Sequence, residues 1–298
     1  MRRHPILFGI VLLLLLGALF FVSVYAVSRF SRGDGRAFST AEKVGVVTVE
    51  GIIRDSREIT EQIENFAGND KIRAVVLRID SPGGGVAPAQ EIYEAVLQLK
   101  RKKKVVASMG SVAASGGYLI ACAANTIVAN PGTITGSISA VMHFANVEEL
   151  MKKIGLKSSV VKSGRYKDIG SPVREMTTEE KVLLQSLVDD IYDQFLDVVS
   201  RDRKIPKEDL KKIADGRIFS GRQARQLKIV DELGDLGYAV RLAGKLTGIQ
   251  GTPETVYPEK KPLRLWELLS QQIFSSFISE IRKGEREMTG LQYLYDGR

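Results

Sequence analysis

Hydrophobic runs and amphipathic segments alternate along the middle of the chain. The runs VGVVTVEG (44–51) and RAVVLRID (73–80) are apolar and rich in β-branched residues, which is typical of strands buried on both faces. The segments REITEQIENFA (57–67) and PAQEIYEAVLQLK (88–100) carry apolar residues at helical spacing. Further segments predict strands at 104–110, 125–130 and 157–164 and a helix at 146–155. Strands that alternate with helices predict a layered α/β domain with a largely parallel sheet.

The second half of this domain contains a long predicted helix. Thr177 and Glu180 form a capping-box pattern, and an apolar stripe from Val182 to Val199 follows at helical spacing. This stripe predicts core packing or a contact between subunits. Residues 215–235 predict a strand–turn–helix unit that packs on the sheet, and residues 262–283 predict an amphipathic helix at a membrane or a partner. We therefore expect an anchor (1–28), a linker (29–43), a catalytic domain (44–248) and an amphipathic extension (249–298).

The N-terminal segment is long enough to span a membrane as a helix. Ile6 to Val27 forms a run of 22 residues without a charge, which at about 1.5 Å per residue matches a hydrocarbon core of about 30 Å. The alternative is a cleaved signal peptide ending at Ala26, with Val24 at the −3 position. The short segment before the run favours a single-pass protein whose body lies outside the cytoplasm.

Charge and cysteine content narrow the range of functions. The net charge is +8, and its densest run is KRKKK at 100–104. This run lies at the C-terminal end of a predicted helix, where the helix dipole favours cations. No aromatic motif accompanies it. An anionic membrane surface is therefore a better partner than nucleic acid. Cys122 is the only cysteine, so no intrachain disulfide forms, and no metal-binding motif is present.

Ser115 is the leading candidate for a nucleophile. It lies in SVAASGGYLIACAA, after a predicted strand and at the start of a predicted helix. The chain has only 2 histidines, His4 and His143, so a hydroxyl nucleophile needs another base, and a desolvated lysine is the physical alternative. The competing interpretation is that Ser115 only caps the helix.

Two glycine-rich turns offer backbone N–H groups that would stabilise an oxyanion. Gly83 and Gly84 lie in DSPGGGV, at the carboxyl end of a predicted buried strand, and Gly116 follows Ser115. Ligand sites of α/β sheets form at such strand ends. A plain strand–helix turn or a phosphate-binding loop would also fit the first segment, but no GxxxxGK[ST] pattern is present.

Lys167, in the loop SGRYKDIGSP, is the candidate base, and a surface lysine is the alternative. A base requires the neutral amine, which burial or nearby positive charge favours. Tyr166 and Ile169 offer apolar cover, whereas Asp168 would oppose deprotonation if it pointed at the amine. Ser137, in TITGSIS, is the best hydroxyl to orient the lysine.

Four segments in order, DSPGGGV, SMGSVAASGGYLIA, GTITGSIS and GRYKDIGSPVREMT, resemble the signal peptide peptidase A family in its short, membrane-anchored form. The resemblance covers about residues 44–240. It implies a Clp protease/crotonase-like fold, with Ser115 as nucleophile, Lys167 as general base and Ser137 as the hydroxyl that positions the lysine. The glycines of SPGGG and Gly116 would be the oxyanion donors. One departure is Ser139, where the family usually has glycine.

The resemblance implies a membrane-bound serine endopeptidase that degrades signal peptides left after secretion. Such an enzyme needs no cofactor, and its hydrophobic peptide substrates would reach a homo-oligomeric ring, for which an octamer is a candidate, with serine and lysine contributed by neighbouring subunits. Three alternatives stay open: a peptidase that cuts a membrane-protein partner, a crotonase-fold acyl-CoA enzyme, and a scaffold without activity.

Overall fold

The computed structural model describes residues 5–32, 42–258 and 292–294. The chain forms two compact units, residues 1–41 and residues 42–298. The first unit contains helix α1 (Pro5–Arg32). The anchor expected at residues 1–28 falls partly outside the described residues, and the helices that are described include none whose length and apolar character would carry it across a membrane.

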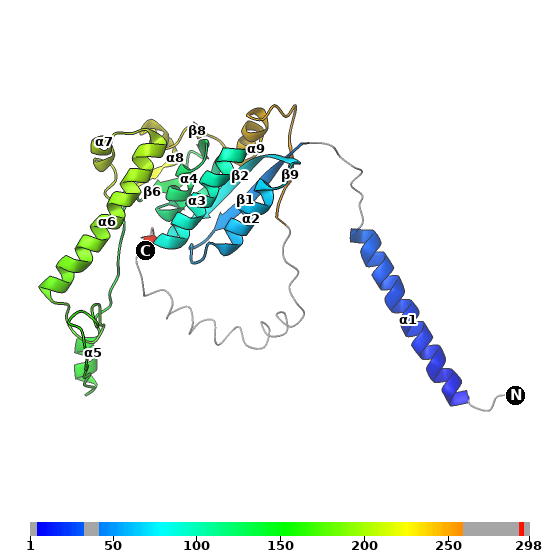
Figure 1. Cartoon of the computed structure of the whole chain (residues 1–298), viewed down its shortest axis with the longest axis horizontal. Coiled ribbons are helices and arrows are strands. Elements are labelled where there is room, and N and C mark those ends of the chain that lie inside the picture. The colour runs from blue at the N-terminus through cyan, green and yellow to red at the C-terminus, as the bar shows by residue number, and fades with distance from the viewer. Residues whose placement is uncertain (1–4, 33–41, 259–291, 295–298) are drawn as a thin grey trace. The chain divides into compact units, whose positions relative to one another are not determined.

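An eight-stranded sheet organises the second unit (Figure 1). Its strands are ordered β7-β6-β4-β2-β1-β9, and β5 lies beside β4 and β8. All neighbours are parallel except β6 and β7, so the predicted, largely parallel sheet is confirmed. The strands are β1 (Lys43–Glu50), β2 (Ile72–Ser81), β4 (Lys104–Ala114), β5 (Thr126–Ala129), β6 (Ile134–Gly136), β7 (Ile218–Ser220), β8 (Glu232–Leu233) and β9 (Glu254–Val256).

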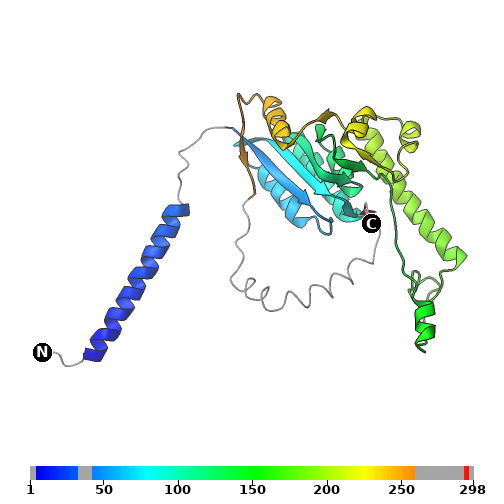
Figure 2. The ribbon, with the colours of Figure 1, turned by 180° about the vertical axis from the view of Figure 1, so that it is seen from behind.

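Helices cover both faces of the sheet (Figures 1 and 2). On one face Val47 and Val49 of β1 belong to a core shared with several helices, and on the other Val44 and Val46 pack against a single helix. Burial on both faces explains why the strands are almost continuously apolar. The first face carries α2 (Arg57–Ala67), α3 (Val86–Lys102), α4 (Gly116–Cys122) and α6 (Thr178–Arg203); the second carries α9 (Leu236–Lys245). Two short helices, α7 (Lys207–Lys211) and α8 (Gly221–Gln226), lie between α6 and α9 in the chain.

Residues 141–176 form an arm that connects β6 to α6 and extends away from the sheet (Figures 1 and 2). The predicted helix in this segment is confirmed as α5 (Glu148–Lys153). The predicted strand at 157–164 is wrong: the segment has no strand and all of its residues are exposed. Its β-branched residues resemble a buried strand, but within the described residues no sheet edge lies beside it, and a strand forms only when its backbone groups find partners.

The apolar stripe of α6 divides into two parts. The predicted capping box of Thr177 and Glu180 is confirmed, with hydrogen bonds in both directions. Phe195 and Val199, toward the C-terminal end, are buried in the core. Val182, near the N-terminal end, is 65% exposed. The stripe therefore supplies both core packing and an uncovered apolar surface.

The sequence predicts that the domain ends at residue 248, but the described residues beyond it include two strands. One is β9, which pairs with β1 at the edge of the sheet. The other is β10 (Gln292–Leu294), which pairs antiparallel with β3 (Gly83–Gly85). The predicted amphipathic helix at 262–283 lies outside the described residues.

Candidate active site

Ser115 occupies a sharp turn between a strand and a helix. β4 ends at Ala114 and α4 begins at Gly116. Ser115 has φ 53° and ψ −118°, a backbone conformation that costs a non-glycine residue about 1–3 kcal/mol. The turn is held by its N–H, which donates to the Gly136 carbonyl at 2.9 Å, and by its carbonyl, which accepts from Leu119 N at 2.9 Å. A strained strand-to-helix turn of this kind presents a nucleophile in α/β hydrolases.

The Ser115 hydroxyl is buried and unsatisfied. The residue is 1% exposed, and its Oγ has no hydrogen-bond partner among the described residues. It makes no capping bond to α4, so the interpretation of Ser115 as a helix cap is wrong. A buried hydroxyl without a partner costs about 1–3 kcal/mol. Such a group is suited to reaction, because no protein hydrogen bond has to be broken before it attacks.

The glycine-rich segment forms strand β3 beside this turn. Ile53 N donates to Gly83 O, and Gly85 N donates to Ile53 O, both at 2.8 Å. The Gly83 N–H bonds to Ser81 Oγ at 3.1 Å. Since backbone groups alternate in direction along a strand, Gly84 directs its N–H to the other side, toward β10. Of the two glycines singled out in the sequence, Gly84 is therefore the one whose N–H a substrate could take over from β10.

Close packing explains why residue 84 is glycine. A Cβ on Gly84 would lie 2.1 Å from the Ile53 carbonyl oxygen. The backbones of Ile53 and β3 approach so closely that no side chain fits between them. The Gly116 N–H, at the first position of α4, lies outside the helix's own hydrogen bonds and is a second donor at this edge.

Ser137 lies next to Ser115 because of strand register. Ala114 of β4 and Gly136 of β6 are partners in a parallel ladder, so the two serines are the residues that follow two paired strand ends, and the Ser115 N–H bonds to the Gly136 carbonyl. Ser137 also has a positive φ (51°), is 7% exposed and donates its N–H to Arg217 O at 2.8 Å. The fold therefore brings together Ser115, Ser137, Gly84 and Gly116.

Lys167 is not part of this group within one chain. It is exposed and lies in a turn of the arm, where its N–H donates to Gly164 O at 3.1 Å. Because Ser115 Oγ has no partner among the described residues, the Lys167 amine is not within hydrogen-bond distance of it. The other basic candidate, His143, is also exposed on the arm.

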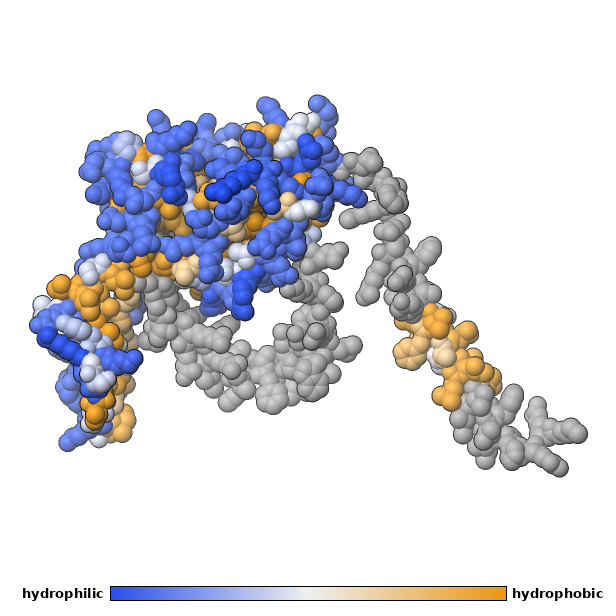
Figure 3. All heavy atoms as spheres, in the orientation of Figure 1, coloured by the Kyte–Doolittle hydropathy of each residue, from blue (hydrophilic) through white to orange (hydrophobic). Residues whose placement is uncertain are grey.

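The arm carries an uncovered apolar surface. None of residues 141–176 is buried, and Figure 3 shows apolar side chains along the arm and the adjoining end of α6. Val161 is fully exposed. Such a patch is unusual for a monomer and marks a contact surface. Its exposed apolar residues are Phe144, Val147, Leu150, Ile154, Leu156, Val160, Val161, Tyr166, Val182, Leu183 and Leu187.

An ion-pair network that the sequence did not predict lies where the arm joins α6. Arg174 binds both oxygens of Asp168 and both oxygens of Glu180. The Arg174 hydrogen bonds lower the pKa of Glu180 from 4.5 to about 2. Stabilisation from this carboxylate is therefore complete above its unfolded pKa and is lost as the pH falls toward 2. No local signal marks this network in the sequence: Asp168 and Glu180 lie six positions on either side of Arg174, a spacing that does not by itself predict a contact.

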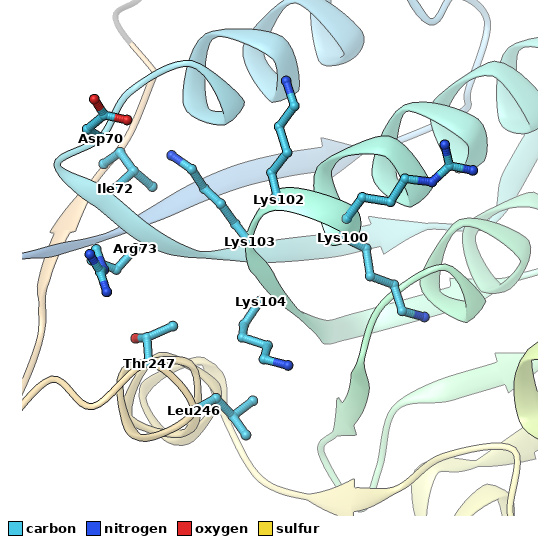
Figure 4. Close-up of a pocket in the computed structure, with 10 residues that line it drawn as sticks. Asp70, Ile72, Arg73, Lys100, Lys102, Lys103, Lys104, Leu246 and Thr247 are labelled. Carbon is cyan, nitrogen blue, oxygen red and sulfur yellow. The ribbon is translucent and has the colours of Figure 1, made fainter.

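A separate, open pocket of about 480 Å³ lies where β2 and β4 begin, at the opposite end of β4 from Ser115 (Figure 4). Lys103 in this pocket donates to the carbonyls of Phe66 and Asn69, and burial lowers its pKa. None of the predicted site residues lies there. The lining is strongly cationic: Arg73, Lys100, Arg101, Lys102, Lys103 and Lys104, with Asp70, Ile72, Leu246 and Thr247.

The described residues offer neither a metal site nor a thiol nucleophile. They contain no group of three or more His, Cys, Asp or Glu side chains placed to hold an ion. Cys122 is buried in α4, and this burial raises the pKa of its thiol to about 12. A thiol with so high a pKa is not a nucleophile near neutral pH.

A strained serine with backbone donors beside it is the arrangement that a serine-type hydrolase requires, and the fold is a layered α/β fold. Comparison with known proteins agrees. Residues 97–250 match the model of peptidase family S49, and residues 38–134 match that of Clp protease. The chain belongs to peptidase family S49, in its SppA branch, and is a serine-type peptidase. This assignment decides against an acyl-CoA enzyme.

Three relatives illustrate the similarity. A protein of Synechocystis sp. named as a protease is 44% identical over 212 residues, which cover 71% of this chain and 76% of the relative. The SppA protein of Enterococcus faecium, named for signal peptide peptidase activity, is 31% identical over 65% of this chain and 60% of its own length. The chloroplastic serine protease SPPA of Arabidopsis thaliana is 32% identical over 69% of this chain but only 30% of its own length.

Proposed function

We propose that the protein is a Ser-Lys endopeptidase that degrades hydrophobic signal peptides after their release from secreted precursors. The observation that carries this proposal is the buried, unpartnered hydroxyl of Ser115 in a strained turn beside Gly84 and Gly116. The name of the Enterococcus relative supports signal peptides as the substrate class.

The chemistry follows from the roles of these groups. Ser115 Oγ attacks the scissile carbonyl while the Lys167 amine takes the serine proton, and Ser137 orients the amine. The N–H groups of Gly84 and Gly116 stabilise the oxyanion. Lys167 then gives the proton to the leaving amine, and water hydrolyses the acyl-enzyme with the same lysine as base.

Lys167 would reach Ser115 from a neighbouring subunit. The support is the exposed position of Lys167 and the apolar surface of the arm, which a second copy would cover. The same surface in every copy would join arm to body in a head-to-tail contact, and such contacts close into rings. We propose a homo-oligomeric ring in which each arm completes the site of the next subunit.

An extended peptide is the form of substrate that this edge favours. The pairing of β10 with β3 demonstrates that the glycine strand accepts an antiparallel segment, and proteins that bind peptides by strand addition use such an edge. The partners Tyr293 and Gly84 lie opposite each other, so β10 and a peptide would compete for the same backbone groups.

Removing β10 should therefore improve substrate binding. Deletion of residues 292–298 is expected to lower the KM for a peptide substrate by about twofold to tenfold, because a competing intramolecular segment is lost. The kcat should stay unchanged. Deletion of residues 295–298 alone, which leaves β10 in place, is the control. An unchanged KM in steady-state assays of the longer deletion would contradict competition at β3.

Membrane association remains part of the proposal, with the body on the extracytoplasmic side. It is supported by the uncharged run Ile6–Val27. The cationic pocket lies at the edge where the chain enters β1, since Lys43 pairs in register with Ile72 of its lining. Clusters of cationic side chains attract anionic lipids. A variant lacking residues 1–32 should be absent from the membrane fraction, whereas the full-length protein should be found there. If the full-length protein is not found in the membrane fraction, this part of the proposal fails.

The substrate class is tested in cells that carry Ser115→Ala in place of the native protein. We expect hydrophobic signal peptides to accumulate in the membrane, where mass spectrometry of extracted peptides would identify them. Cells with Ser111→Ala are the matched control, because Ser111 is exposed on the same strand. Accumulation of one uncut membrane protein, without signal peptides, would instead favour a peptidase for a membrane-protein partner.

A further inference from the structure

Arg174 links the turn that carries Lys167 to the start of α6. Arg174 binds the Asp168 carboxylate through Nε and Nη2, at 2.9 and 3.0 Å. It binds the Glu180 carboxylate through Nη1 and Nη2, at 2.8 and 2.5 Å. Two forked contacts on one guanidinium fix distance and orientation together.

The second carboxylate is itself fixed. Glu180 is 3% exposed, and it accepts from Thr177 N at 2.9 Å as part of the capping box of α6. The network therefore runs from the turn, through Arg174, to the first turn of a helix whose other end lies in the core. The adjacent Asp168 also accepts a bond from Lys162.

The network also binds the carboxylate of Asp168, the residue that follows Lys167 in the sequence. A carboxylate without a partner, placed beside the Lys167 amine, would favour the protonated form of the amine. The amine could then not act as a base. In the structure two cations, Arg174 and Lys162, occupy Asp168 and hold its pKa well below the usual range. The charges of Asp168, Glu180, Arg174 and Lys162 sum to zero, so the cluster is electrically balanced without Lys167.

We propose that Arg174 is a positioning residue for Lys167: it holds the turn on α6 and keeps Asp168 from pairing with the lysine amine. This inference rests on the proposed role of Lys167 as the base. Two further ion pairs lie near the turn. Arg165 pairs with Glu179, and the backbone of Glu175 bonds to Glu148, which in turn pairs with Lys152.

The test is the pH dependence of kcat/KM for a peptide substrate. In Arg174→Met, Asp168 is released from the guanidinium, and the acid limb of the profile should move to higher pH by about one unit, the scale of one nearby charge. Adding Asp168→Asn should return the limb to the native position, because the released carboxylate is gone, although the link to α6 stays broken. A purely structural role would change stability without this reversal.

Arg165→Met is the matched control, since it removes a cation from the same turn without touching Asp168. Its exposed ion pair is screened, so its profile should stay within a few tenths of a unit of the native one. An Arg174→Met profile at the native position, or an equal shift in Arg165→Met, would overturn the proposal. If Arg174→Met does not fold, Arg174→Lys replaces it; a lysine makes fewer contacts, and the same direction of shift is expected.

Failure of the base assignment is distinguishable from failure of this inference. If Lys167→Ala keeps its activity, Lys167 is not the base and the proposed mechanism itself is wrong. If Lys167→Ala is inactive and Arg174→Met keeps the native profile, only the positioning role of Arg174 is wrong. Circular dichroism of each variant establishes that the compared proteins are folded.

Discussion

Ser115→Ala is expected to lower peptide hydrolysis by about 10⁶-fold, the scale on which loss of a serine nucleophile acts in other hydrolases. The reason is geometric as well as chemical. Ser115 is the hydroxyl that the strained turn places beside Gly84 and Gly116, and no protein group competes for it. The measurement is the rate of cleavage of a fluorogenic peptide by the purified, full-length protein.

The same substitution should not destabilise the fold. Ser115 makes no capping bond, and removing an unsatisfied buried hydroxyl relieves a cost of about 1–3 kcal/mol. We therefore expect the free energy of unfolding to stay level or to rise by about 1 kcal/mol in denaturant titrations. A loss of activity accompanied by a gain in stability is typical of a strained catalytic residue.

Two neighbouring serines are the controls. Ser108 accepts a hydrogen bond from Arg78, and Ser111 is exposed. Alanine at either position should keep catalysis within a few-fold of the native rate, although Ser108→Ala should lose stability because a buried bond is broken. A serine-reactive phosphonate that labels Ser111, or an active Ser115→Ala enzyme, would refute the assignment of the nucleophile.

Lys167→Arg should lower activity by roughly 10²- to 10⁴-fold, because a guanidinium does not deprotonate near neutral pH. Lys167→Ala should be similarly inactive. Mixed assemblies of Ser115→Ala and Lys167→Ala subunits should nevertheless recover about a quarter of the native activity. Each kind of subunit occupies either side of a head-to-tail junction half the time, so one junction in four has both groups intact.

The mixing experiment separates two architectures. If one chain held both groups, every site in a mixture would lack one of them, and activity would stay at the level of the separate variants. Absence of recovery in assemblies shown by native mass spectrometry to contain both subunits would exclude the shared site. If the Lys167→Arg enzyme kept high activity without any partner variant, His143 would become the candidate base.

The sequence determined the sheet and the turn at its edge. Runs such as 44–51 and 73–80 are apolar throughout because both faces of a central parallel sheet are buried, and this pattern does not depend on distant contacts. The capping box of Thr177 and Glu180 is equally local. Ser115 was recognisable because a small polar residue between a strand and two glycines marks a tight strand–helix turn.

Tertiary structure decided what lies beside that turn. Ser137 is adjacent to Ser115 only because Ala114 and Gly136 pair in register, and pairing between distant strands leaves no local mark in the sequence. The direction of the Gly84 N–H depends on Ile53, which the fold places along the other side of β3. The pairing of β10 with β3 likewise joins segments about 200 residues apart.

The arm shows why local composition by itself does not determine a strand. Residues 157–164 have the composition of a strand, yet they form none, because a strand needs a neighbour to accept its backbone hydrogen bonds and the arm stands away from the sheet. The link from Asp168 through Arg174 to Glu180 also follows from folding, since it joins a turn to a helix start. The sequence by itself predicted the central strands, most of the helices and the candidate reactive groups; their neighbours were decided by strand register and by the path of the arm, which only packing of the whole chain fixes.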